Sequence, residues 1–424
     1  MLEHDRPITR AWVLHPDVKS NHSRRLAEPA LEEAVSLAAA LPDLQVVGSE
    51  VVRLPKMHAG MLFGKGKIEE LKQRIKAAEV ELVLVDGPVS PVQQRNLEKA
   101  WDVKLLDRTG LILEIFSDRA RTAEGVLQVE MAALSYQRTR LVRAWTHLER
   151  QRGGLGFVGG PGETQIEADR RAIDMQLKAL RQNLEKVVKT RTLHRAGRAK
   201  VPFPIVALVG YTNAGKSTLF NKLTGAEVFA KDMLFATLDP TMRKITLPSG
   251  DDVIMSDTVG FISDLPTELV AAFRATLEEV LDADLIVHVR DISHAQSEEQ
   301  SHDVMQILES LGVAEGSPLI EVWNKIDRVD DEAREAMIKT ADRTDDLYAV
   351  SAITGEGMAR LLDDLASKLK DPRSEAVLEL SFAQGRERAW LFDQGIVTDD
   401  TQTDDGYKLT VFWTSLQKER FSRL

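Results

Sequence analysis

An apolar segment that runs directly into a glycine-rich turn is the feature that most constrains the fold of this chain. Residues 205–209 (IVALV) are aliphatic, as in a buried strand, and residues 210–217 (GYTNAGKS) follow at once. This spacing of glycines, lysine and serine predicts a phosphate-binding loop. We favour it over a purely structural glycine turn, because few chance matches to the pattern also lie between a strand and a helix.

The spacing of this loop has a chemical reason. The glycines let backbone N–H groups surround a β-phosphate, Lys216 places a charge on the β and γ oxygens, and Ser217 presents a hydroxyl to Mg²⁺. We therefore predict a nucleotide site that uses Mg²⁺, with Lys216 as a catalytic residue.

Two further segments fit the metal and γ-phosphate side of such a site. Thr237, in FATLDPT (235–241), follows Ser217 by twenty residues, where a switch loop presents a threonine to Mg²⁺ and the γ-phosphate. Residues 257–260 (DTVG) follow the strand-like VIMS. We predict that Asp257 holds the metal through water and that the Gly260 N–H contacts the γ-phosphate, so that Thr237 and Gly260 share the catalytic role.

Two more segments fit a guanine pocket. Residues 324–327 (NKID) end the strand-like LIEVW, and Asp327 is predicted to accept hydrogen bonds from guanine N1 and N2, which adenine cannot donate. Ser351 and Ala352 follow LYAV, where a backbone N–H is predicted to reach the guanine oxygen. Alone, DTVG or NKID also fits an ordinary turn at a strand end. Ordered together behind the phosphate loop, they predict a GTPase.

The predicted GTP contacts come from five segments. They are Gly210, Tyr211, Thr212, Asn213, Ala214, Gly215, Lys216, Ser217, Thr218, Phe235, Ala236, Thr237, Leu238, Asp239, Asp257, Thr258, Val259, Gly260, Asn324, Lys325, Ile326, Asp327, Ser351, Ala352 and Ile353. The predicted metal ligands are Ser217, Thr237 and Asp257.

Charge is distributed unevenly along the 424 residues. The whole chain carries a formal charge of −11, which taken alone argues against a nucleic-acid partner. Residues 119–200, however, hold 17 Lys/Arg and 8 Asp/Glu, a local +9 that leaves −20 for the remaining residues. A basic segment of this kind predicts contact with RNA phosphates.

The basic segment also has a heptad pattern. Leu127, Leu134, Leu141 and Leu148 repeat every seven residues, and the same spacing returns from Ile166 onward. Two such repeats joined by a loop predict an antiparallel helical hairpin. The loop, 152–162, holds six glycines and one proline between arginines, and it fits either a flexible linker or an RNA-binding finger. The predicted RNA contacts are Arg143, Arg150, Arg152, Gly154, Phe157, Arg170 and Arg171.

The remaining segments complete an α/β multidomain chain. Residues 1–115 alternate strand-like and helical stretches, which indicates βαβ units on a parallel sheet. We expect the hairpin at 116–200, a GTPase domain with a mostly parallel sheet flanked by helices at 201–371, and a small α+β domain at 372–424. In the first domain, residues 64–67 (GKGK) fit either an anion site at a helix start or a solvated loop.

Three stretches carry a family resemblance: 153–171 (GGLGFVGGPGETQIEADRR), 63–71 (FGKGKIEEL) and 235–241 (FATLDPT). In them the chain resembles the HflX family of ribosome-associated P-loop GTPases, of the translation-factor class. The resemblance implies GTP hydrolysis, binding to the large ribosomal subunit and its rRNA through the hairpin, and a role in splitting or rescuing stalled or idle ribosomes. It also implies an adenine-nucleotide or RNA contact in the N-terminal domain.

Two other functions stay open at this point. One is an ATP-dependent protein that remodels RNA or ribosomes through residues 1–115, about which the guanine motif says nothing. The other is a nucleotide-gated regulatory scaffold, for which the basic hairpin is only a docking surface for another protein.

The chain departs from simpler GTPases after DTVG. Many GTPases place there a glutamine that orients the attacking water, whereas this chain has Phe261. An apolar side chain cannot hold a water by hydrogen bonding, so we expect slow hydrolysis that the bound ribosome completes. Asn213 resembles the loop asparagine of potassium-dependent GTPases, which implies K⁺ near the β and γ phosphates; alternatively it only shapes the turn.

Several classes of protein are disfavoured. The chain has no cysteine, which excludes disulfides and thiolate metal sites. His288 and His294 lack a third ligand at metal spacing, so we do not expect a zinc site. No apolar run reaches the length of a membrane span and no signal-peptide pattern opens the chain, so we expect a soluble cytoplasmic monomer without stable membrane insertion.

Overall fold

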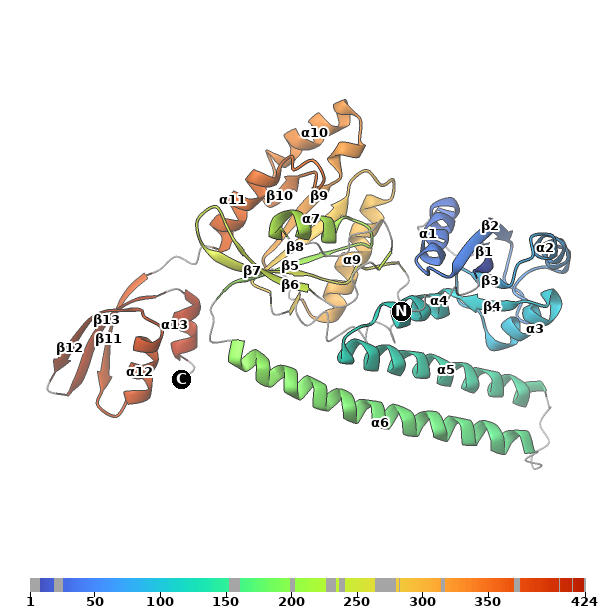
Figure 1. Ribbon diagram of the computed structural model, residues 1–424, viewed down its shortest axis with the longest axis horizontal. Helices are drawn as coiled ribbons and strands as arrows, with labels where there is room; N and C mark the ends of the chain where they lie inside the picture. Colours follow the sequence, from blue (N-terminus) through green and yellow to red (C-terminus); the bar gives the residue numbers. More distant parts are fainter. Residues whose placement is uncertain are drawn as a thin grey trace, which may run out of the picture. The chain divides into compact units, whose positions relative to one another are not determined.

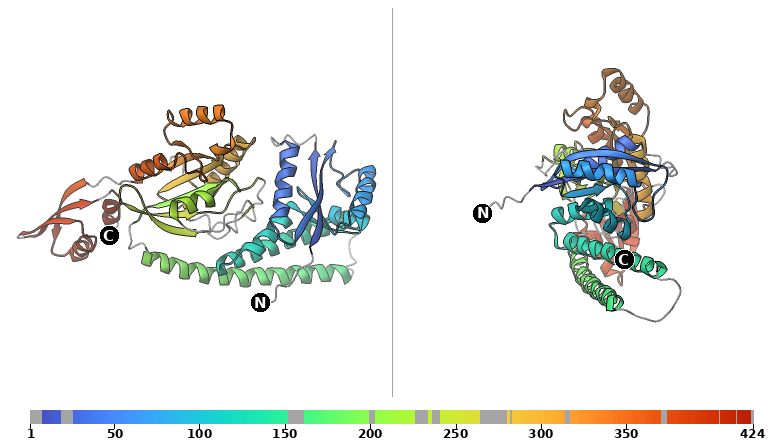
Figure 2. Two further views of the ribbon diagram at one scale, coloured as in Figure 1. Left: turned by 45° about the horizontal axis from the view of Figure 1, so that its top comes forward. Right: turned by 90° about the vertical axis from the view of Figure 1, so that its right-hand side faces the viewer.

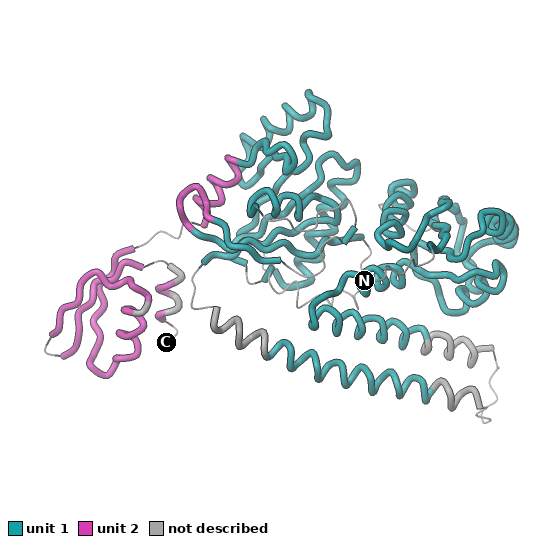
Figure 3. The backbone as a smooth tube through the Cα atoms, in the orientation of Figure 1, with its two compact units in different colours: residues 1–245, 252–358 teal, residues 246–251, 359–424 magenta. Residues whose placement is uncertain are grey.

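The computed structural model describes residues 8–18, 26–151, 161–198, 203–225, 234–235, 241–263, 280–281, 283–313, 317–369, 374–403, 405–413 and 415–422. The chain divides into two compact units (Figure 3): residues 1–245 with 252–358, and residues 246–251 with 359–424. None of the helices in the described ranges has an apolar stretch long enough to cross a bilayer.

The first part of the larger unit is a parallel sheet with helices on both faces (Figure 1). Its elements are β1 (Thr9–Val18), α1 (Ala27–Ala39), β2 (Leu44–Leu54), α2 (Lys65–Ala77), β3 (Leu82–Val85), α3 (Pro91–Trp101), β4 (Lys104–Asp107) and α4 (Arg108–Arg119), with strand order β2-β1-β3-β4. Helices α2 and α3 pack on one face around Phe63 and Trp101, and α1 and α4 pack on the other with Leu37 and Phe116. This confirms the predicted βαβ architecture.

Local signals fix where these helices begin. Ser90 caps α3 in a capping box with Gln93, and Pro91 occupies the first helical turn, where its missing N–H costs nothing. Asp107 caps α4 by accepting from the Gly110 N–H at 2.9 Å.

Two long helices follow and lie side by side in Figures 1 and 2: α5 (Ala123–Gln151) and α6 (Pro161–Arg198). An ion pair of 2.7 Å between Arg138 and Asp174 crosses the hairpin, and Leu177 is buried. The predicted antiparallel hairpin is confirmed. Tyr136 and Arg140 of α5 donate to the Asp107 carboxylate, at 2.5 and 2.9 Å, and so attach the hairpin to the N-terminal sheet.

The second sheet of the larger unit has strand order β10-β9-β8-β5-β7-β6 (Figure 1). Its strands are β5 (Ile205–Gly210), β6 (Thr241–Thr246), β7 (Asp252–Asp257), β8 (Leu285–Asp291), β9 (Leu319–Asn324) and β10 (Leu347–Ala349). Strand β5 pairs in parallel with both β7 and β8, so its carboxyl end lies between theirs. Residues 206–210 are all buried, as expected for a central strand covered on both faces.

The helices of this part are α7 (Lys216–Thr224), α9 (Ser297–Leu311), the 3₁₀ turn η1 (Ile326–Arg328), α10 (Asp331–Ala341) and α11 (Met358–Leu369). Residues 359–369 of α11 are assigned to the smaller unit.

The smaller unit contains a three-stranded antiparallel sheet of order β11-β13-β12. Its elements are β11 (Ser374–Ser381), α12 (Gly385–Asp393), β12 (Val397–Thr403), β13 (Gly406–Trp413) and α13 (Ser415–Ser422). Strand β12 reads VTDDTQT and has no apolar alternation beyond Val397, so the sequence pattern gives no sign of it.

Candidate nucleotide-binding site

The predicted phosphate loop lies at the carboxyl end of β5, where residues 211–215 turn into α7. Two of its glycines are required by close approach as well as by φ. A Cβ on Gly210 (φ 151°) would lie 2.2 Å from the Val289 carbonyl oxygen, and one on Gly215 (φ 94°) would lie 2.2 Å from Asn324 Nδ2. The loop therefore packs against β8 and β9 in a way that any side chain would prevent.

Lys216 begins α7 and points back into the loop. Its ammonium donates to the Gly210 carbonyl at 3.1 Å and to the Tyr211 carbonyl at 2.8 Å. Burial lowers the pKa of Lys216 to about 8, while the Asp257 carboxylate opposes this shift and Lys325 adds to it. A buried ammonium with only two carbonyl partners is well placed to receive a phosphate oxygen.

Two hard oxygen donors meet beside Lys216. Ser217 Oγ donates to Asp257 Oδ2 at 2.6 Å, and Asp257 is fully buried. Among the described residues no group of three His, Cys, Asp or Glu side chains is arranged to hold a metal. One hydroxyl and one carboxylate nevertheless fit Mg²⁺, because this ion usually binds through one or two protein oxygens, waters and substrate phosphates.

The DTVG segment lies directly against the phosphate loop. Thr212 N donates to the Phe261 carbonyl at 2.7 Å, and Phe261 N donates to the Gly210 carbonyl at 3.1 Å. A Cβ on Gly260 would lie 2.7 Å from Thr212 Cγ2 and 3.0 Å from Lys216 Nζ. Gly260 is therefore next to the lysine, as the predicted γ-phosphate contact requires. The Phe261 side chain is buried in the core and presents no polar group.

The guanine-side segments also converge on the loop. Asn324 Nδ2 donates to the Ala214 carbonyl at 2.9 Å, and its Oδ1 accepts from Ala352 N at 3.1 Å. Asp327 Oδ1 accepts from Ser351 Oγ at 2.5 Å. Lys325, at φ 67°, forms an ion pair of 2.7 Å with Asp291. Asn324 thus ties the phosphate loop to the segment predicted to bind the base.

Other predicted site residues fall partly outside the described chain. Ala236, Thr237, Leu238 and Asp239 lie outside it, and so do Arg152, Gly154 and Phe157; for Arg143 and Arg150 on α5 only the helix is described. Phe235 is buried, with its ring 4.6 Å from that of Phe116 on α4. Arg170 and Arg171 are 53% and 75% exposed on α6, beside Asp174 at 4.0 Å and Glu167 at 3.1 Å. Such exposed pairs are weak, so both arginines stay accessible to RNA.

A polar junction joins the site to the N-terminal sheet, and the sequence analysis missed it. The Tyr211 hydroxyl lies 2.6 Å from Ser263 Oγ, accepts from Ser263 N at 2.8 Å and donates to Glu33 on α1. Arg108 pairs with Glu33, donates to Asp86 at 2.6 Å and donates to the Ser263 carbonyl at 3.0 Å. We call these five residues the junction. They stand singly along the chain, so no local pattern indicates them.

Burial and pairing set the charges in the junction. Burial opposes ionisation of Asp86, but the hydrogen bond from His15, at 2.7 Å, and the charge of Arg108 outweigh it and hold its pKa below the ordinary value. Arg108 is buried and stays protonated, since its two carboxylate partners raise its pKa against desolvation. The junction therefore contains compensated charges.

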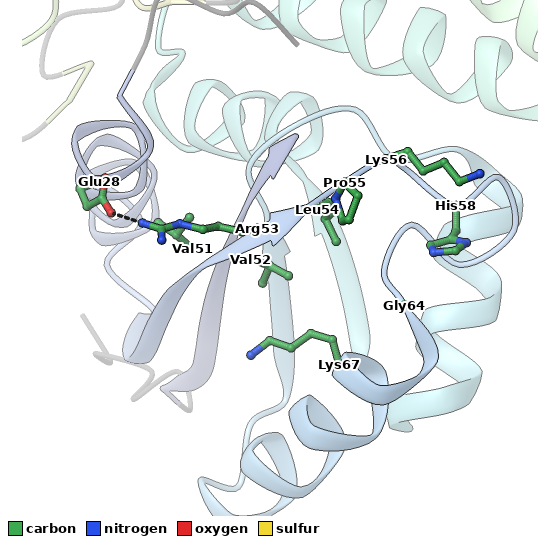
Figure 4. A pocket seen from close by; sticks show the side chains of 10 residues that line it. All are labelled: Glu28, Val51, Val52, Arg53, Leu54, Pro55, Lys56, His58, Gly64 and Lys67. Atoms are coloured by element: carbon green, nitrogen blue, oxygen red, sulfur yellow. Dashed lines mark hydrogen bonds and ion pairs between the residues drawn. The ribbon is translucent and has the colours of Figure 1, made fainter. Parts of the chain in front are cut away.

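The N-terminal sheet also has a hollow at the carboxyl end of β2 (Figure 4). It is lined by Glu28, Val51, Val52, Arg53, Leu54, Pro55, Lys56, His58, Gly64 and Lys67. Arg53 lies 3.4 Å from Glu28, and Lys67 pairs with Glu50 at 3.2 Å and Glu70 at 3.0 Å. The charge of Lys67 is thus already compensated by two carboxylates.

Neither His288 nor His294 belongs to a group of three potential metal ligands in the described part of the chain. His288 on β8 is buried, and in the described part of the chain neither ring nitrogen has a hydrogen-bond partner. Burial lowers its pKa to about 4, with a further contribution from Arg290 and Lys216, so its ring is neutral at pH 7. His294 is exposed and accepts from Gln296 N at 3.1 Å.

Four family models match successive parts of the chain. They are described as GTP-binding GTPase N-terminal (28–117), GTP-binding GTPase Middle Region (119–198), 50S ribosome-binding GTPase (205–325) and HflX C-terminal domain (336–423). Together they cover most of the sequence.

Whole-chain relatives agree with the models. The GTPase HflX of Magnetococcus marinus is 46% identical over 414 residues, 97% of this chain and 94% of that protein. The GTPase HflX of Escherichia coli K12 is 43% identical over 376 residues, 88% of this chain and 86% of that protein. A solved GTP-binding protein from Sulfolobus solfataricus, in complex with GDP, aligns with 85% of this chain and 99% of its own at 20% identity and a TM-score of 0.46. Because the two HflX relatives are 46% and 43% identical to it over most of its length, the chain belongs to the HflX family of GTP-binding GTPases and is a GTP hydrolase.

Proposed function

We propose that this GTPase binds the large ribosomal subunit in its GTP form and leaves it after hydrolysis, and that this cycle splits or rescues stalled or idle ribosomes. The basic hairpin is the observation that supports binding to the ribosome. Tyr136 and Arg140 of the hairpin bind Asp107 of the N-terminal domain. Arg108 of the same domain donates to the Ser263 carbonyl, close to DTVG. The 50S ribosome-binding GTPase model at 205–325 supports the same partner.

In the proposed site the loop amides and Lys216 bind the β and γ phosphates. Asp327 accepts from the guanine N1 and N2 groups, and Ala352 N is available to its oxygen. Ser217 and Asp257 would hold Mg²⁺, with Thr237 added from the switch loop; when bound, the ion neutralises charge on the phosphate oxygens.

Hydrolysis then requires a water positioned in line with the γ-phosphorus. The water oxygen bonds to phosphorus as the bond to the bridging oxygen of GDP breaks. Lys216 and the Gly260 N–H stabilise charge on the transferred group, but Phe261 cannot orient the water. We therefore propose that contact with the ribosome completes the site.

The loop conformation also fits the proposed K⁺ contact. Asn213 has φ 59° and is exposed in the phosphate loop, and we propose that its side-chain oxygen binds a cation near the β and γ phosphates. Equal GTP turnover in Na⁺ and K⁺ at matched ionic strength would remove this part of the proposal and leave the rest.

The proposed hairpin contact is electrostatic. Exposed Arg170 and Arg171, together with the loop arginines, would contact RNA phosphates, while the acidic remainder of the chain limits non-specific adhesion. We propose that the protein acts in the cytoplasm as a monomer.

Cosedimentation with separated ribosomal subunits tests the proposal. We expect the chain to pellet with large subunits in the presence of a non-hydrolysable GTP analogue, and to do so at least tenfold less with GDP or with small subunits. Equal binding to both subunits, or binding that ignores the nucleotide, would contradict it.

A further inference from the structure

Among the described residues of the smaller unit, helices α12 and α13 cover one face of the C-terminal sheet (Figure 1). Its core contains Leu409, Val411 and Trp413 of β13, together with Leu391 of α12, and Phe421 of α13 packs against it. Alternation along each strand therefore turns the intervening side chains to the opposite side of the sheet. We call that side the open face.

The strand register defines the residues of the open face. Glu375 of β11 is opposite Phe412 of β13, Val377 is opposite Thr410, and Glu379 is opposite Lys408. On the other side of β13, Asp399 of β12 is opposite Thr410 and Thr401 is opposite Lys408. The open face thus consists of three cross-strand rows, in which charged residues surround a centre of Val377, Thr410 and Phe412.

Two large apolar side chains are exposed on this face. Val377 is 55% exposed and Phe412 is 43% exposed. The open face of an antiparallel sheet normally carries polar side chains, so both residues break the expected alternation. In the described chain, moreover, every phenylalanine among the exposed large hydrophobic residues lies in this sheet unit: Phe382, Phe392 and Phe412. Exposed aromatic residues of this kind are typical of a protein-binding surface.

The charges around these two residues select the kind of partner. Glu375, Glu379 and Asp399 are exposed on the face, against one lysine, Lys408. Carboxylates repel RNA phosphates, so a face with this balance is unsuited to rRNA. It suits a surface that is rich in Lys and Arg and that also has an apolar recess, because interfaces pair opposite potentials.

We propose that the open face docks a lysine- and arginine-rich protein of the large ribosomal subunit, with Phe412 and Val377 as the apolar anchor and Glu375, Glu379 and Asp399 as the charged rim. The inference rests on the proposed binding to that subunit. It assigns two separate segments of the chain to different partners: the hairpin contacts RNA and the C-terminal sheet contacts protein.

Charge reversal on the open face should weaken binding to a basic protein but strengthen binding to RNA. The variant Glu375→Lys/Glu379→Lys is expected to weaken binding to purified large subunits at least fivefold, measured by cosedimentation with a non-hydrolysable GTP analogue. The matched control Glu309→Lys/Glu335→Lys changes the net charge equally on exposed positions of α9 and α10. It should leave binding unchanged or tighten it. Tighter binding of the first variant, or equal effects of the two, would contradict the proposal.

The apolar anchor is tested separately. Phe412→Thr/Val377→Thr keeps strand-compatible residues on the open face and leaves the core on the other face untouched. We expect three- to tenfold weaker binding to large subunits, with the ribosome-free rate of GTP hydrolysis and the melting temperature both close to those of the unaltered chain. Unchanged affinity of this variant would contradict the anchor role.

Crosslinking identifies the occupant directly. With a benzoyl-phenylalanine at position 412 and purified large subunits, the expected product is a crosslink to a basic ribosomal protein. A crosslink to rRNA, to the larger unit of the same chain or to a second copy would overturn the proposal. If the unaltered chain does not bind large subunits, the proposed function fails and this inference fails with it; if only the variants disagree, the proposed function stands.

Discussion

The N-terminal sheet and the GTPase sheet of the larger unit differ at the carboxyl ends of their parallel strands. In the GTPase sheet, Lys216 and Ser217 lie at the turn that follows β5. Within the described chain, Thr212 Oγ1 in this turn is buried without a hydrogen-bond partner. At the edge of the N-terminal sheet, Asp86 is paired with His15 and Arg108, and Arg108 is also paired with Glu33. Similar architecture therefore yields a ligand site in one sheet and an internally paired junction in the other, and the side chains rather than the fold decide which.

The two edges also meet. Arg108 and Glu33 of the N-terminal sheet contact Ser263 and Tyr211, which flank the DTVG segment and the phosphate loop. Below them, one hydrophobic core includes Phe116 of α4, Phe235 and Phe261. The position at which many GTPases place a water-orienting glutamine is thus occupied by part of the core between the two sheets.

The largest expected effect concerns base recognition at the GTPase edge. Asp327→Asn replaces an acceptor that Ser351 orients, so it should shift the preference from GTP toward xanthosine triphosphate by a factor on the order of 10³. Competition binding with both nucleotides measures the ratio, and Asp331→Asn on α10 is the control. Full retention of guanine selectivity would refute the role of Asp327.

The next effect tests whether the N-terminal edge is held by paired charges. Arg108→Met keeps much of the side-chain volume but removes the guanidinium that Asp86 and Glu33 share, so we expect a loss of about 3–5 kcal/mol in the free energy of unfolding. Urea unfolding followed by tryptophan fluorescence measures this value. Arg95→Met, an exposed change on α3, should cost little. A loss below about 1 kcal/mol in the free energy of unfolding for Arg108→Met would mean that these ion pairs do not stabilise the junction.

Alanine variants of two lysines, one at each site, compare the GTPase sheet with the N-terminal sheet directly. Lys216→Ala should weaken GTP binding about 30- to 150-fold, the equivalent of ~2–3 kcal/mol for a charged hydrogen-bond donor. Lys67, which likewise stands in the first turn of a helix after a strand but pairs with Glu50 and Glu70, is the matched control. Its alanine variant should bind GTP as the unaltered chain does, by equilibrium titration. Similar losses in both variants would contradict the assignment of the ligand site to one edge.

The smallest effect concerns a histidine. His288 has a folded-state pKa of about 4 against an ordinary 6.5, so between these values the unfolded chain binds a proton that the folded chain does not. Its contribution to stability is therefore complete above pH 6.5 and falls by about 2 kcal/mol on acidification to pH 5. Unfolding at both pH values should show a smaller pH dependence in His288→Asn than in the unaltered chain. His294→Asn, at an exposed position, should retain it.

Local patterns predicted most of the fold and the nucleotide site. Strand-to-helix alternation indicated both parallel sheets, and the segments around Lys216, Asp257 and Asn324 converge in space as their order predicts. The missed features have no local signal. Strand β12 is polar because it lies at the edge of its sheet. The junction includes Glu33, which binds Tyr211 but which looks in sequence like an ordinary surface charge.

The most direct test of the account is GTP turnover with and without purified large subunits, for the unaltered chain and for a chain in which residues 153–162 are shortened. Because none of the predicted GTP contacts lies in residues 153–162, the shortened chain should keep the ribosome-free rate. It should also lose the stimulation, at least tenfold, that large subunits give the unaltered chain. Equal stimulation of both chains would contradict the claim that the hairpin carries ribosomal contact to the nucleotide site.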